Sequence, residues 1–535
     1  MPGASRSVPR PLRGRRPVVA RLAEFQGKQV LRGAGIAVPR GELARSAEAA
    51  AAVAGRLGDT VVIKAQAWTT SRKAQGLVRF ADSAAAASEA AAAILAARAG
   101  GFPVAEVLVE ERVAIATERY AGIIIDDRRR RPVLLVSARG GSGIEETARE
   151  HPESVAELPL DAVEGLARHA ARELWRRVGV HGEEQRHLAE ACVRLAAVAR
   201  AVEARAAEVN PLVFTADGRA VALDCRITVD DAAVFRHPEL GIDVARELGH
   251  PPTPLERIAW EVEKDDYRGT FYFLQMRDAC ERGTRVVAFH GAGGGGSMMG
   301  MDALARHGFA VANFCDTSGN PPASKVYRAA RILLSQPGVD GYFGTGSGVA
   351  SQEQFHSARG LVKAFLEEPL AVPAVVRLGG NGEEKAIEIL TGYTKALGVP
   401  VECYGKDTPV DACAARLAAL VAAAAPPAPR PPRREPAPAE RPYTFASPTG
   451  AITYDHAVCA RCESKACVAA CVPQILELSG DGVPVLKVTG EEAARGRCTE
   501  CLACEVDCRA LGAGGGHVAL AIAGLPEYRR ERGLG

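Results

Sequence analysis

Residues 208–227 read EVNPLVFTADGRAVALDCRI, and this stretch says most about the architecture of the first half of the chain. Two apolar runs flank the polar segment TADGR, and Asp-Gly between such runs is a strong β-hairpin signal. The hairpin places Asn210 and Asp224 on adjacent strands. Side-chain oxygens of this kind suit Mg²⁺, which takes one or two carboxylates with phosphate oxygens and water. A magnesium site is therefore predicted here, against the alternative of solvated hairpin residues.

Short apolar strands surround this hairpin and alternate with alanine-rich stretches of helical composition. Strands are predicted at residues 61–65 (VVIKA), 107–111 (VLVEE), 131–137 (RPVLLVS) and 220–226 (AVALDCR). Short runs of apolar and β-branched residues bounded by polar segments are typical of strands. The body of the chain is therefore predicted to be α/β.

A second pattern begins near Arg285, where strand, glycine-rich turn and helix repeat at the spacing of a doubly wound parallel sheet. The strands with their turns are VVAFHGAGGGG (286–296), FAVANFCD (309–316), VDGYFGTGSG (339–348) and AVPAVVRLGGN (371–381). Ligands of open parallel sheets bind at the carboxyl ends of the strands, where these turns lie.

One of these turns, FGTGSGVASQEQF (343–355), is a candidate phosphoryl-binding turn. Gly344, Gly346 and Gly348 precede an expected helix, and helix N-termini bind anions through free N–H groups and the macrodipole. Gly344 and Gly346 are therefore catalytic candidates, and a purely structural turn is the alternative. His290, at the end of an earlier strand, is a weaker candidate phosphate carrier, because a single histidine there is more often a packing residue.

Cysteines crowd into the last part of the chain, which holds eight of the fourteen as Cys459-x2-Cys462-x4-Cys467-x3-Cys471 and Cys498-x2-Cys501-x2-Cys504-x3-Cys508. Thiolates are soft ligands that hold iron, and a four-iron cluster needs four of them. Two iron–sulfur clusters and electron transfer are predicted. Structural zinc and disulfides are the alternatives, since paired Cys-x2-Cys also builds zinc sites.

The cysteine segment resembles the two-cluster bacterial ferredoxins, in which the fourth cysteine of each run binds the other cluster. The resemblance implies that one cluster is held by Cys459, Cys462, Cys467 and Cys508, and the other by Cys498, Cys501, Cys504 and Cys471. The first run departs from the pattern in the four residues before Cys467 and in Val472, which separates Cys471 from Pro473. Arg509 replaces the proline of the second run. The remaining cysteines are expected to be small core residues: Cys192, Cys225, Cys280, Cys315, Cys403 and Cys413.

Composition restricts the class of protein. The chain has 535 residues, 47% hydrophobic and 24% charged, with a net charge of +2, so several domains are expected and bulk nucleic-acid binding is not. No apolar stretch has the length of a membrane span, and no signal peptide is evident, so a cytoplasmic location is expected.

Domain boundaries follow from these patterns. The expected segments are a disordered basic tail (1–21), a nucleotide-binding domain (22–250), a parallel-sheet domain (251–421), a Pro/Ala-rich linker (422–445) and the cysteine-rich domain (446–535). The linker is expected to tether the cysteine-rich domain without a permanent interface, at a high local concentration.

From about Leu22 to Leu390 the chain resembles the beta subunit of succinyl-CoA synthetase and related NDP-forming acyl-CoA synthetases. The matching segments include FQGKQVLRGAGIAVPRG, VVIKAQ, LVEERVAIATERY, GGSGIEETA, the hairpin quoted above, FRHPEL, HGAG, ANFCD and AVVRLGGN. The resemblance implies an ATP-grasp fold followed by a flavodoxin-like domain, and the tail adds a small α+β ferredoxin-like domain.

The same resemblance implies roles for individual residues. Lys64 would meet nucleotide phosphates, Glu110 would lie at the hinge that holds adenine, and Glu208 would help position a phosphorylated histidine. Asn210 and Asp224 match the magnesium ligands. The glycine-rich phosphate loop of the family, resembling GGRGKAGG, is here TSRKAQG (70–76), in which Arg72 and Lys73 keep the positive charge. Arg139 stands where the family has an acidic residue before paired glycines.

The chain has no segment resembling the CoA-binding alpha subunit and no recognisable phosphohistidine motif, so a partner is implied. In this interpretation the chain binds Mg-ATP or Mg-ADP and phosphorylates a histidine of an alpha-like partner, which binds CoA and forms the acyl-CoA. The clusters would exchange electrons with an oxidoreductase. The alternative is an electron-transfer subunit whose ATP-grasp body is a scaffold, and ATP hydrolysis coupled to low-potential electron transfer is a third option.

Overall fold

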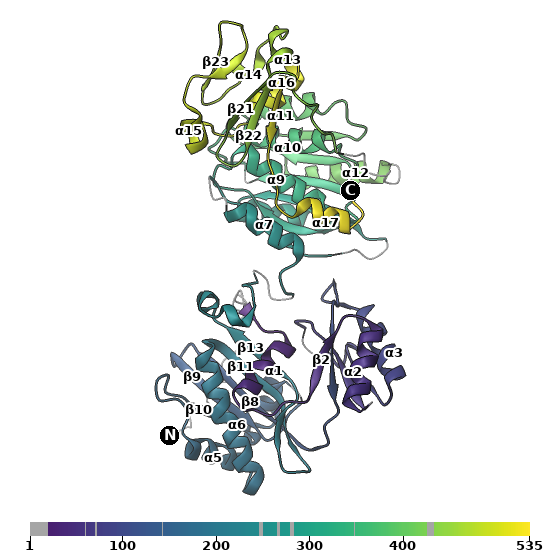
Figure 1. Ribbon diagram of the computed structural model, residues 1–535, viewed down its shortest axis with the longest axis vertical. Coiled ribbons are helices and arrows are strands. Elements are labelled where there is room, and N and C mark those ends of the chain that lie inside the picture. Colours follow the sequence, from purple (N-terminus) through teal and green to yellow (C-terminus); the bar gives the residue numbers. More distant parts are fainter. Residues whose placement is uncertain are drawn as a thin grey trace, which may run out of the picture. The chain divides into compact units, whose positions relative to one another are not determined.

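The computed structural model describes residues 20–534 except 59, 70–71, 142, 246–249, 265–267, 279–282, 347 and 425–432. The chain divides into two compact units, Met1–Pro252 and Thr253–Gly535. Figure 1 traces the first unit in purple to teal and the second from teal through green to yellow. Each unit has its own buried core, and each is described separately below.

The first unit contains a large antiparallel sheet. Its order is β1 (Ala20–Arg21), β13 (Cys225–Val229), β11 (Ala204–Thr215), β8 (Ile115–Asp126), β9 (Arg131–Ser137) and β10 (Val155–Pro159), with β12 (Ala220–Ala222) paired to β11. The helices of this lobe are α1 (Glu24–Gly33), α4 (Ile144–Glu150), α5 (Arg168–Arg177) and α6 (Gly182–Ala201). The expected hairpin is present, but its second arm is two strands, β12 and β13, separated by Leu223 and Asp224.

A smaller lobe of the same unit holds a second antiparallel sheet. Its order is β2 (Gly41–Ala44), β7 (Val107–Glu111), β3 (Val61–Ala65) and β4 (Val78–Ala81), covered by α2 (Ala47–Leu57) and α3 (Ala84–Leu95) and followed by the short pair β5 (Arg98–Ala99) and β6 (Phe102–Pro103). Alternate residues of β3 are fully buried, and Lys64 lies between two of them. Two lobes with separate sheets match the expected ATP-grasp organisation.

The second unit begins with a mostly parallel sheet. Its order is β14 (Tyr272–Gln275), β17 (Asn313–Asp316), β15 (Arg285–Ala292), β18 (Gly341–Gly346), β19 (Ala374–Arg377) and β20 (Val401–Tyr404), with β16 (Phe309–Val311) beside β15. Only the β14 edge pair is antiparallel among these ladders. The helices are α7 (Pro254–Lys264), α8 (Gly294–Arg306), α9 (Ala323–Leu334), α10 (Phe355–Glu367), α11 (Glu383–Tyr393) and α12 (Val410–Ala423).

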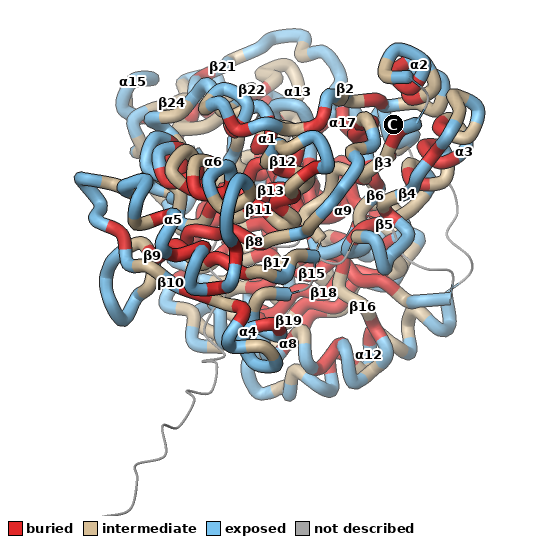
Figure 2. The backbone as a smooth tube through the Cα atoms, turned by 90° about the horizontal axis from the view of Figure 1, so that it is seen from below, coloured by how far each residue is buried: buried red, intermediate tan, exposed pale blue. Residues whose placement is uncertain are grey.

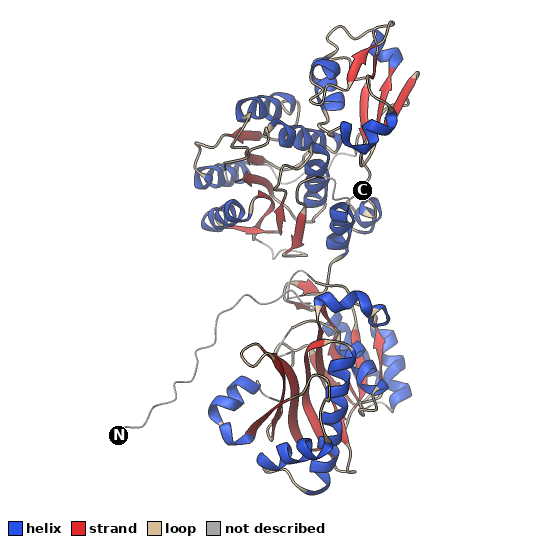
Figure 3. Ribbon diagram, turned by 90° about the vertical axis from the view of Figure 1, so that its left-hand side faces the viewer, coloured by secondary structure: helices blue, strands red, loops and turns tan. Residues whose placement is uncertain are grey.

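Helices cover both faces of this sheet, as Figure 3 shows with blue helices on either side of red strands. Strand β15 explains why, because its side chains alternate between two cores. Val286 and Ala288 belong to the core shared with α9 and α10, whereas Val287 and Phe289 belong to the core shared with α8 and α12. A doubly wound, flavodoxin-like arrangement follows, and Figure 2 shows its strands buried.

The cysteine-rich lobe follows in the same unit. It contains the antiparallel strands β21 (Pro442–Ala446), β22 (Ala451–Asp455) and β25 (Gly516–Ala519), the hairpin β23 (Leu476–Leu478) and β24 (Pro484–Leu486), and the helices α13 (His456–Ala460), α14 (Ala466–Ala469), α15 (Gly490–Glu492), α16 (Ala503–Leu511) and α17 (Leu525–Glu531). Its apolar residues share one continuous core with those of α9 and α10. The prediction of a tethered domain without a permanent interface is therefore wrong, because the lobe is packed onto the parallel-sheet domain.

Two expected boundaries also shift. Ala20 and Arg21, assigned to the disordered tail, form β1 and pair with Val229 and Thr228, whereas residues 1–19 lie outside the described residues. Helix α12 extends to Ala423 and β21 begins at Pro442, inside the predicted linker, of which residues 425–432 are not described. Arg433 of the linker forms an ion pair with the buried Glu367, at 2.6 Å. The linker therefore ends against the body of the protein.

Candidate functional site

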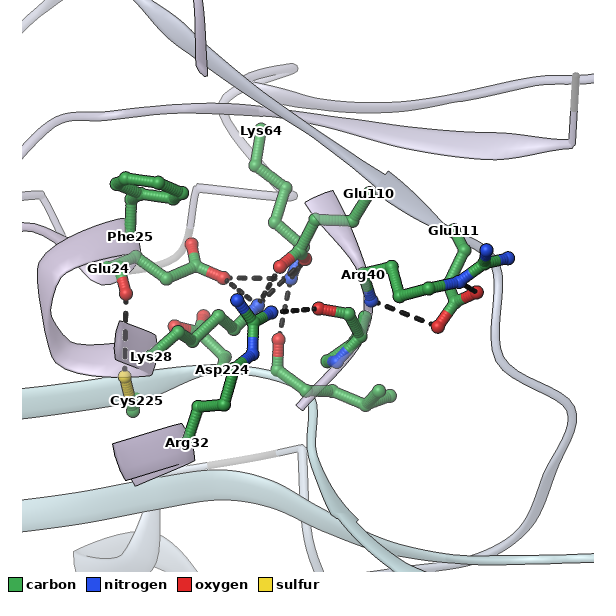
Figure 4. Close-up of polar contacts among 12 residues, drawn as sticks. Glu24, Phe25, Lys28, Arg32, Arg40, Lys64, Glu110, Glu111, Asp224 and Cys225 are labelled. Atoms are coloured by element: carbon green, nitrogen blue, oxygen red, sulfur yellow. Dashed lines mark hydrogen bonds and ion pairs between the residues drawn. The ribbon is translucent and has the colours of Figure 1, made fainter. Parts of the chain in front are cut away.

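Lys64 points from the small lobe of the first unit into a cluster of buried charges. Its Nζ atom lies 2.9 Å from a carboxylate oxygen of Glu24 and 2.9 Å from one of Glu110. It also donates a 2.6 Å hydrogen bond to the Leu223 carbonyl, the residue before Asp224 on the large sheet. Lys64 therefore joins the two lobes, and Figure 4 shows the side chains converging.

Arg72 brings the candidate phosphate loop to the candidate metal ligand. Its guanidinium lies 2.6 Å from Asp224 and 2.6 Å from Glu24, and it donates to the Ala65 carbonyl at 2.9 Å. The structure therefore unites the predicted residues Lys64, Arg72 and Asp224 at one place. In this state the Asp224 carboxylate is bound by an arginine of its own chain.

Glu24 and Lys28 complete the cluster, and the sequence analysis missed both. Lys28 Nζ lies 2.7 Å from Glu24 and 2.6 Å from Glu110, and the side chains of these three residues are 3% exposed. The available signal was an ordinary i,i+4 pair on α1, which is usually a surface feature. Within the described part of the chain, three cations (Lys28, Lys64, Arg72) thus balance three carboxylates (Glu24, Glu110, Asp224).

Glu24 and Asp224 are the two carboxylates that share Arg72, and their surroundings shift the two pKa values in opposite directions. Burial alone would raise the pKa of Glu24, but Lys28, Lys64 and Arg72 together hold it well below its usual range. Burial and the neighbouring Glu24 raise the pKa of Asp224, against the pull of Arg72. Burial would lower the pKa of Lys64, yet Glu24 and Glu110 raise it above its usual value. Glu24 is therefore the firmly ionised anion, and Asp224 is the carboxylate that gains most from another cation.

Asn210 and Asp224 are neighbours across the hairpin, as predicted. The Asn210 amide donates to the Asp224 carbonyl at 3.1 Å, and Asn210 Oδ1 accepts a 2.9 Å hydrogen bond from the Gly141 amide. Glu208 lies on the same strand, opposite Arg226. Burial raises the pKa of Glu208 despite the nearby Arg226. These oxygens, with Asp224, could hold a divalent ion between the hairpin and a bound phosphate.

Two other predicted residues take different places. The side chain of Lys73 is exposed and does not join the buried cluster. Glu110 is buried as the counter-ion of Lys28 and Lys64, and its strand β7 pairs on both sides, with β2 and β3. Backbone groups of a strand paired on both sides are used by the sheet. The adenine hinge at Glu110 stays a prediction, to which the structure adds a charge-balancing role for the side chain.

The glycines of residues 343–355 do not open a helix. Gly344 and Gly346 end β18, whereas α10 begins at Phe355. A Cβ atom on Gly344 would lie 2.8 Å from Val376 Cγ1, so packing between β18 and β19 requires this glycine. A Cβ atom on Gly346 would meet its nearest neighbour at 3.5 Å. The expectation that these glycines open a helix is therefore wrong for both, and a phosphoryl-binding role for their backbone groups stays a prediction.

His290 is a packing residue in this structure. It is buried on β15, with Nδ1 hydrogen-bonded to the Tyr342 hydroxyl and Nε2 2.9 Å from Thr317 Oγ1. Burial lowers the pKa of His290 to about 4. Both ring nitrogens are thus committed, which disfavours a phosphate-carrier role. Five of the six scattered cysteines, all except Cys280, are buried as expected, and Cys280 lies outside the described residues.

In the second unit the cysteines separate into two groups, each drawing on both runs. A small cavity of about 20 Å³ is lined by Cys471 of the first run and by Cys498, Cys501 and Cys504 of the second. The rest of its lining is mostly apolar, including Phe445, Ile475 and Leu502. The cavity thus collects the four cysteines that the ferredoxin resemblance assigned together.

The other four cysteines lie around α16 and the glycines after it. The Cys467 thiol hydrogen-bonds Cys508, and this bond, with amides of residues 514–516 and against the effect of burial, lowers the pKa of Cys508 to about 6. Burial and the charges of the nearby Cys508 and Cys462 raise the pKa of the Cys459 thiol. A Cβ atom on Gly512 would lie 3.3 Å from Cys462 Sγ, and one on Gly515 would lie 3.0 Å from Cys459 Sγ. The turn that contains Gly512 and Gly515 therefore passes close to these cysteines and encloses them.

Among the described residues, no group of three or more His, Cys, Asp and Glu side chains has the arrangement of a site for one metal ion. Of the helices in the described ranges, none combines the length and apolar character needed to cross a lipid bilayer.

Comparison with known proteins places the chain in a family. The sequence model of the ATP-grasp domain matches residues 21–214, and that of the citrate-binding region of ATP citrate lyase matches residues 280–419. An ATP citrate lyase structure from Methanothrix soehngenii, in complex with citrate and coenzyme A, superposes with a TM-score of 0.52 over 76% of this chain and 99% of that one, at 19% identity. At this identity the superposition shows the fold alone.

Sequence relatives are closer. The GDP-forming succinate–CoA ligase beta subunit of Thermus thermophilus is 36% identical over 372 residues, which cover 69% of this chain and 93% of the relative. The ADP-forming beta subunit of Ignicoccus hospitalis is 33% identical over 383 residues, covering 71% of this chain and 95% of the relative. With this identity across nearly the whole length of both relatives, the chain belongs to the ATP-grasp family of succinate–CoA ligase beta subunits.

Proposed function

We propose that the chain is the nucleotide-binding subunit of an acyl-CoA synthetase that also carries an iron–sulfur electron-transfer module. The convergence of Lys64, Arg72 and Asp224 from two lobes carries the first part. Lys64 and Arg72 of the small lobe can contact nucleotide phosphates. The side-chain oxygens of the hairpin residues Asn210 and Asp224 can hold Mg²⁺ next to those phosphates. The curated relatives are named as ADP- or GDP-forming ligases, which supports a nucleoside diphosphate as product.

The proposed reaction joins a carboxylate to CoA at the cost of ATP or GTP. The nucleotide passes its γ-phosphoryl group to a histidine of an alpha-like partner and leaves as diphosphate. That phosphoryl group moves to the carboxylate, and the CoA thiol then displaces phosphate from the acyl phosphate to give the thioester. In this scheme Glu208 orients the partner's histidine, and Gly346 lies on the strand end that faces the phosphoryl group.

The cysteine groups carry the second part of the proposal. Eight thiols in two sets of four match the ligand count of two [4Fe–4S] clusters, and Cys471, Cys498, Cys501 and Cys504 line one cavity together. Each cluster, when bound, would take up or release one electron. The chain's own residues supply the thiolates and the apolar wall that keeps water away. An oxidoreductase that acts on the same acyl-CoA is the proposed electron partner.

The first test is calorimetric titration of the full chain with nucleotide, with and without Mg²⁺. Asp224→Asn should lower the affinity for Mg-ATP or Mg-GTP at least tenfold, because a metal contact is lost, and should not lower the affinity for metal-free nucleotide, because Arg72 is released from Asp224 to meet the phosphates. Lys73→Met, on the same loop but exposed, is the matched control. Absence of nucleotide binding by the unaltered chain, with and without an alpha-like partner, would favour the scaffold alternative.

The second test is chemical analysis of protein purified without oxygen. About eight iron atoms and about eight sulfides per chain are expected for two four-iron clusters. Zinc without acid-labile sulfide would refute the assignment and leave structural zinc as the interpretation.

A further inference from the structure

The second cysteine run carries acidic residues between its cysteines, and all of them are buried. The run reads Cys498-Thr-Glu-Cys501-Leu-Ala-Cys504-Glu-Val-Asp-Cys508. Glu500 and Glu505 are 2% exposed and Asp507 is 3% exposed. A buried carboxylate is costly unless it is paired and hydrogen-bonded, so each of these side chains needs a partner.

The partners lie on helices of the parallel-sheet domain. Glu505 accepts from Lys363 Nζ of α10 at 2.7 Å, and Asp507 lies 2.7 Å from Arg359 Nε of the same helix. Glu500 binds the Ser324 hydroxyl at the start of α9. Arg359 and Lys363 are themselves buried, with side chains 1% and 0% exposed. These residues form two buried ion pairs between α10 and the cysteine-bearing helix α16.

The rest of the interface fixes the same orientation. Arg328 of α9 donates to the carbonyls of Ala521 at 3.0 Å and Thr449 at 2.6 Å. Lys363 is held from its own side by Glu367 at 2.9 Å, and its Nζ atom lies 5.0 Å from the centre of the Tyr327 ring. Lys363 is therefore held in place by groups of the parallel-sheet domain as well as by the cysteine-rich lobe.

We propose that Lys363 and Arg359 are positioning residues that hold the second cysteine run and keep the reduction potentials of the two groups bound by its cysteines higher than they would be without them. The inference rests on the proposed iron–sulfur function. An electron added to a buried group adds negative charge, and a fixed cation in a low-dielectric interior stabilises that charge. Because the acids of the run would otherwise oppose reduction, the two helix cations offset them. A part of the acyl-CoA synthetase fold would thus set the redox behaviour of the attached module.

A comparison of three full-length proteins, purified without oxygen, isolates the charge of Lys363. Glu505→Gln removes the carboxylate but keeps an oxygen for the Val518 amide, which now donates to Glu505 at 2.8 Å. The third protein is the double variant Glu505→Gln/Lys363→Met. It removes the Lys363 cation from a protein in which residue 505 can no longer carry a charge. The measured quantities are iron and sulfide content, the melting temperature and the midpoint potential from a redox titration followed by electron paramagnetic resonance.

Glu505→Gln should raise the midpoint potential above that of the unaltered protein. The double variant should lie below Glu505→Gln by roughly tenfold in electron affinity, which is ~59 mV for one electron. Arg532→Met is the matched control, because Arg532 pairs with Asp278 at 2.9 Å in the same unit and touches no acid of the run. It should leave the potential unchanged even if the melting temperature falls.

Equal potentials for Glu505→Gln and the double variant, both with full iron and sulfide, would overturn the inference and leave Lys363 a purely structural residue. If the double variant loses iron while Glu505→Gln and Arg532→Met retain it, the positioning role is supported, and Asp507→Asn against Arg359→Met/Asp507→Asn then tests the potential. Absence of iron and sulfide from the unaltered protein would instead refute the iron–sulfur proposal itself, and this inference with it.

Discussion

Arg72 lies 2.6 Å from Asp224 and so occupies the carboxylate that the sequence assigns to Mg²⁺. The same arginine lies in the segment that replaces a glycine-rich phosphate loop. Its guanidinium therefore neutralises Asp224 as long as no other cation does. A metal–nucleotide complex would have to take Asp224 from Arg72, while its phosphates offer the arginine new acceptors.

Removal of Arg72 should let a divalent ion bind without nucleotide. In Arg72→Met the buried cluster keeps three carboxylates and only two cations, so one negative charge is uncompensated. An opposite charge about 4 Å away is worth several kcal/mol at an effective dielectric constant of about 20, and solvent reduces this, so roughly tenfold tighter Mn²⁺ binding is expected. Electron paramagnetic resonance of free Mn²⁺ measures it. Affinity no greater than that of Lys73→Met would contradict the competition.

The grouping of cysteines should appear in pairs of substitutions. Cys459 and Cys508 are expected to serve one cluster, so Cys459→Ser/Cys508→Ser should lose about half of the iron, no more than either single variant. Cys459 and Cys471 are expected to serve different clusters, so Cys459→Ser/Cys471→Ser should lose nearly all of it. Iron and sulfide analysis decides, and the opposite pattern would mean that each run holds its own cluster.

Gly344 and Gly346 should differ in their tolerance of a methyl group. Gly344→Ala places a Cβ atom 2.8 Å from Val376 Cγ1, and overpacking of this kind costs about 1–3 kcal/mol of unfolding free energy. Gly346→Ala has 3.5 Å to its nearest neighbour and should cost little. Denaturant unfolding of the second unit is the measurement, and Gly344→Ala/Val376→Ala should recover part of the loss. Equal costs for the two glycines would show that packing is not the reason for Gly344.

His290 should make the second unit sensitive to mild acid. Its pKa of about 4 in the folded state lies below the unfolded value of about 6.5, so the unfolded chain binds the extra proton between these values. Stability is therefore complete above about pH 6.5 and is lost as the pH falls toward 4, by up to about 3 kcal/mol.

The measurement is thermal unfolding of the second unit between about pH 7.5 and pH 5. His290→Asn keeps polar atoms near Thr317 and Tyr342 but cannot be protonated in this range, so its melting temperature should fall less steeply with pH. Burial also lowers the pKa of His356 to about 4, so some slope should remain. Identical slopes for the two proteins would rule out a contribution from His290.

Local pattern predicted the strands and the hairpin well, because alternation and turn chemistry are local properties. Strands β3, β7 and β9 have the predicted bounds, and Asn210 and Asp224 meet as expected. The charge cluster could not be predicted, because Lys28 and Glu110 are 82 residues apart and neither has a distinctive neighbourhood in the sequence. Nothing in the sequence around the acids of the second cysteine run indicates that they are buried or that Lys363 and Arg359 are their partners. Contacts between distant buried charges depend on the assembled fold.

The segment between Ala423 and Pro442 joins α12 and β21, which already belong to one packed unit. The segment therefore connects these two elements but is not needed to hold them together. For a flexible loop with fixed ends, each doubling of length costs only about 0.6 kcal/mol. Insertions there should leave the position of the cysteine-rich lobe unchanged, and a cut in the segment should leave the two pieces associated. The cysteine-rich lobe is thus packed as a part of the parallel-sheet domain. The covalent link mainly ensures that each copy of that domain is synthesised together with its own cysteine-rich lobe.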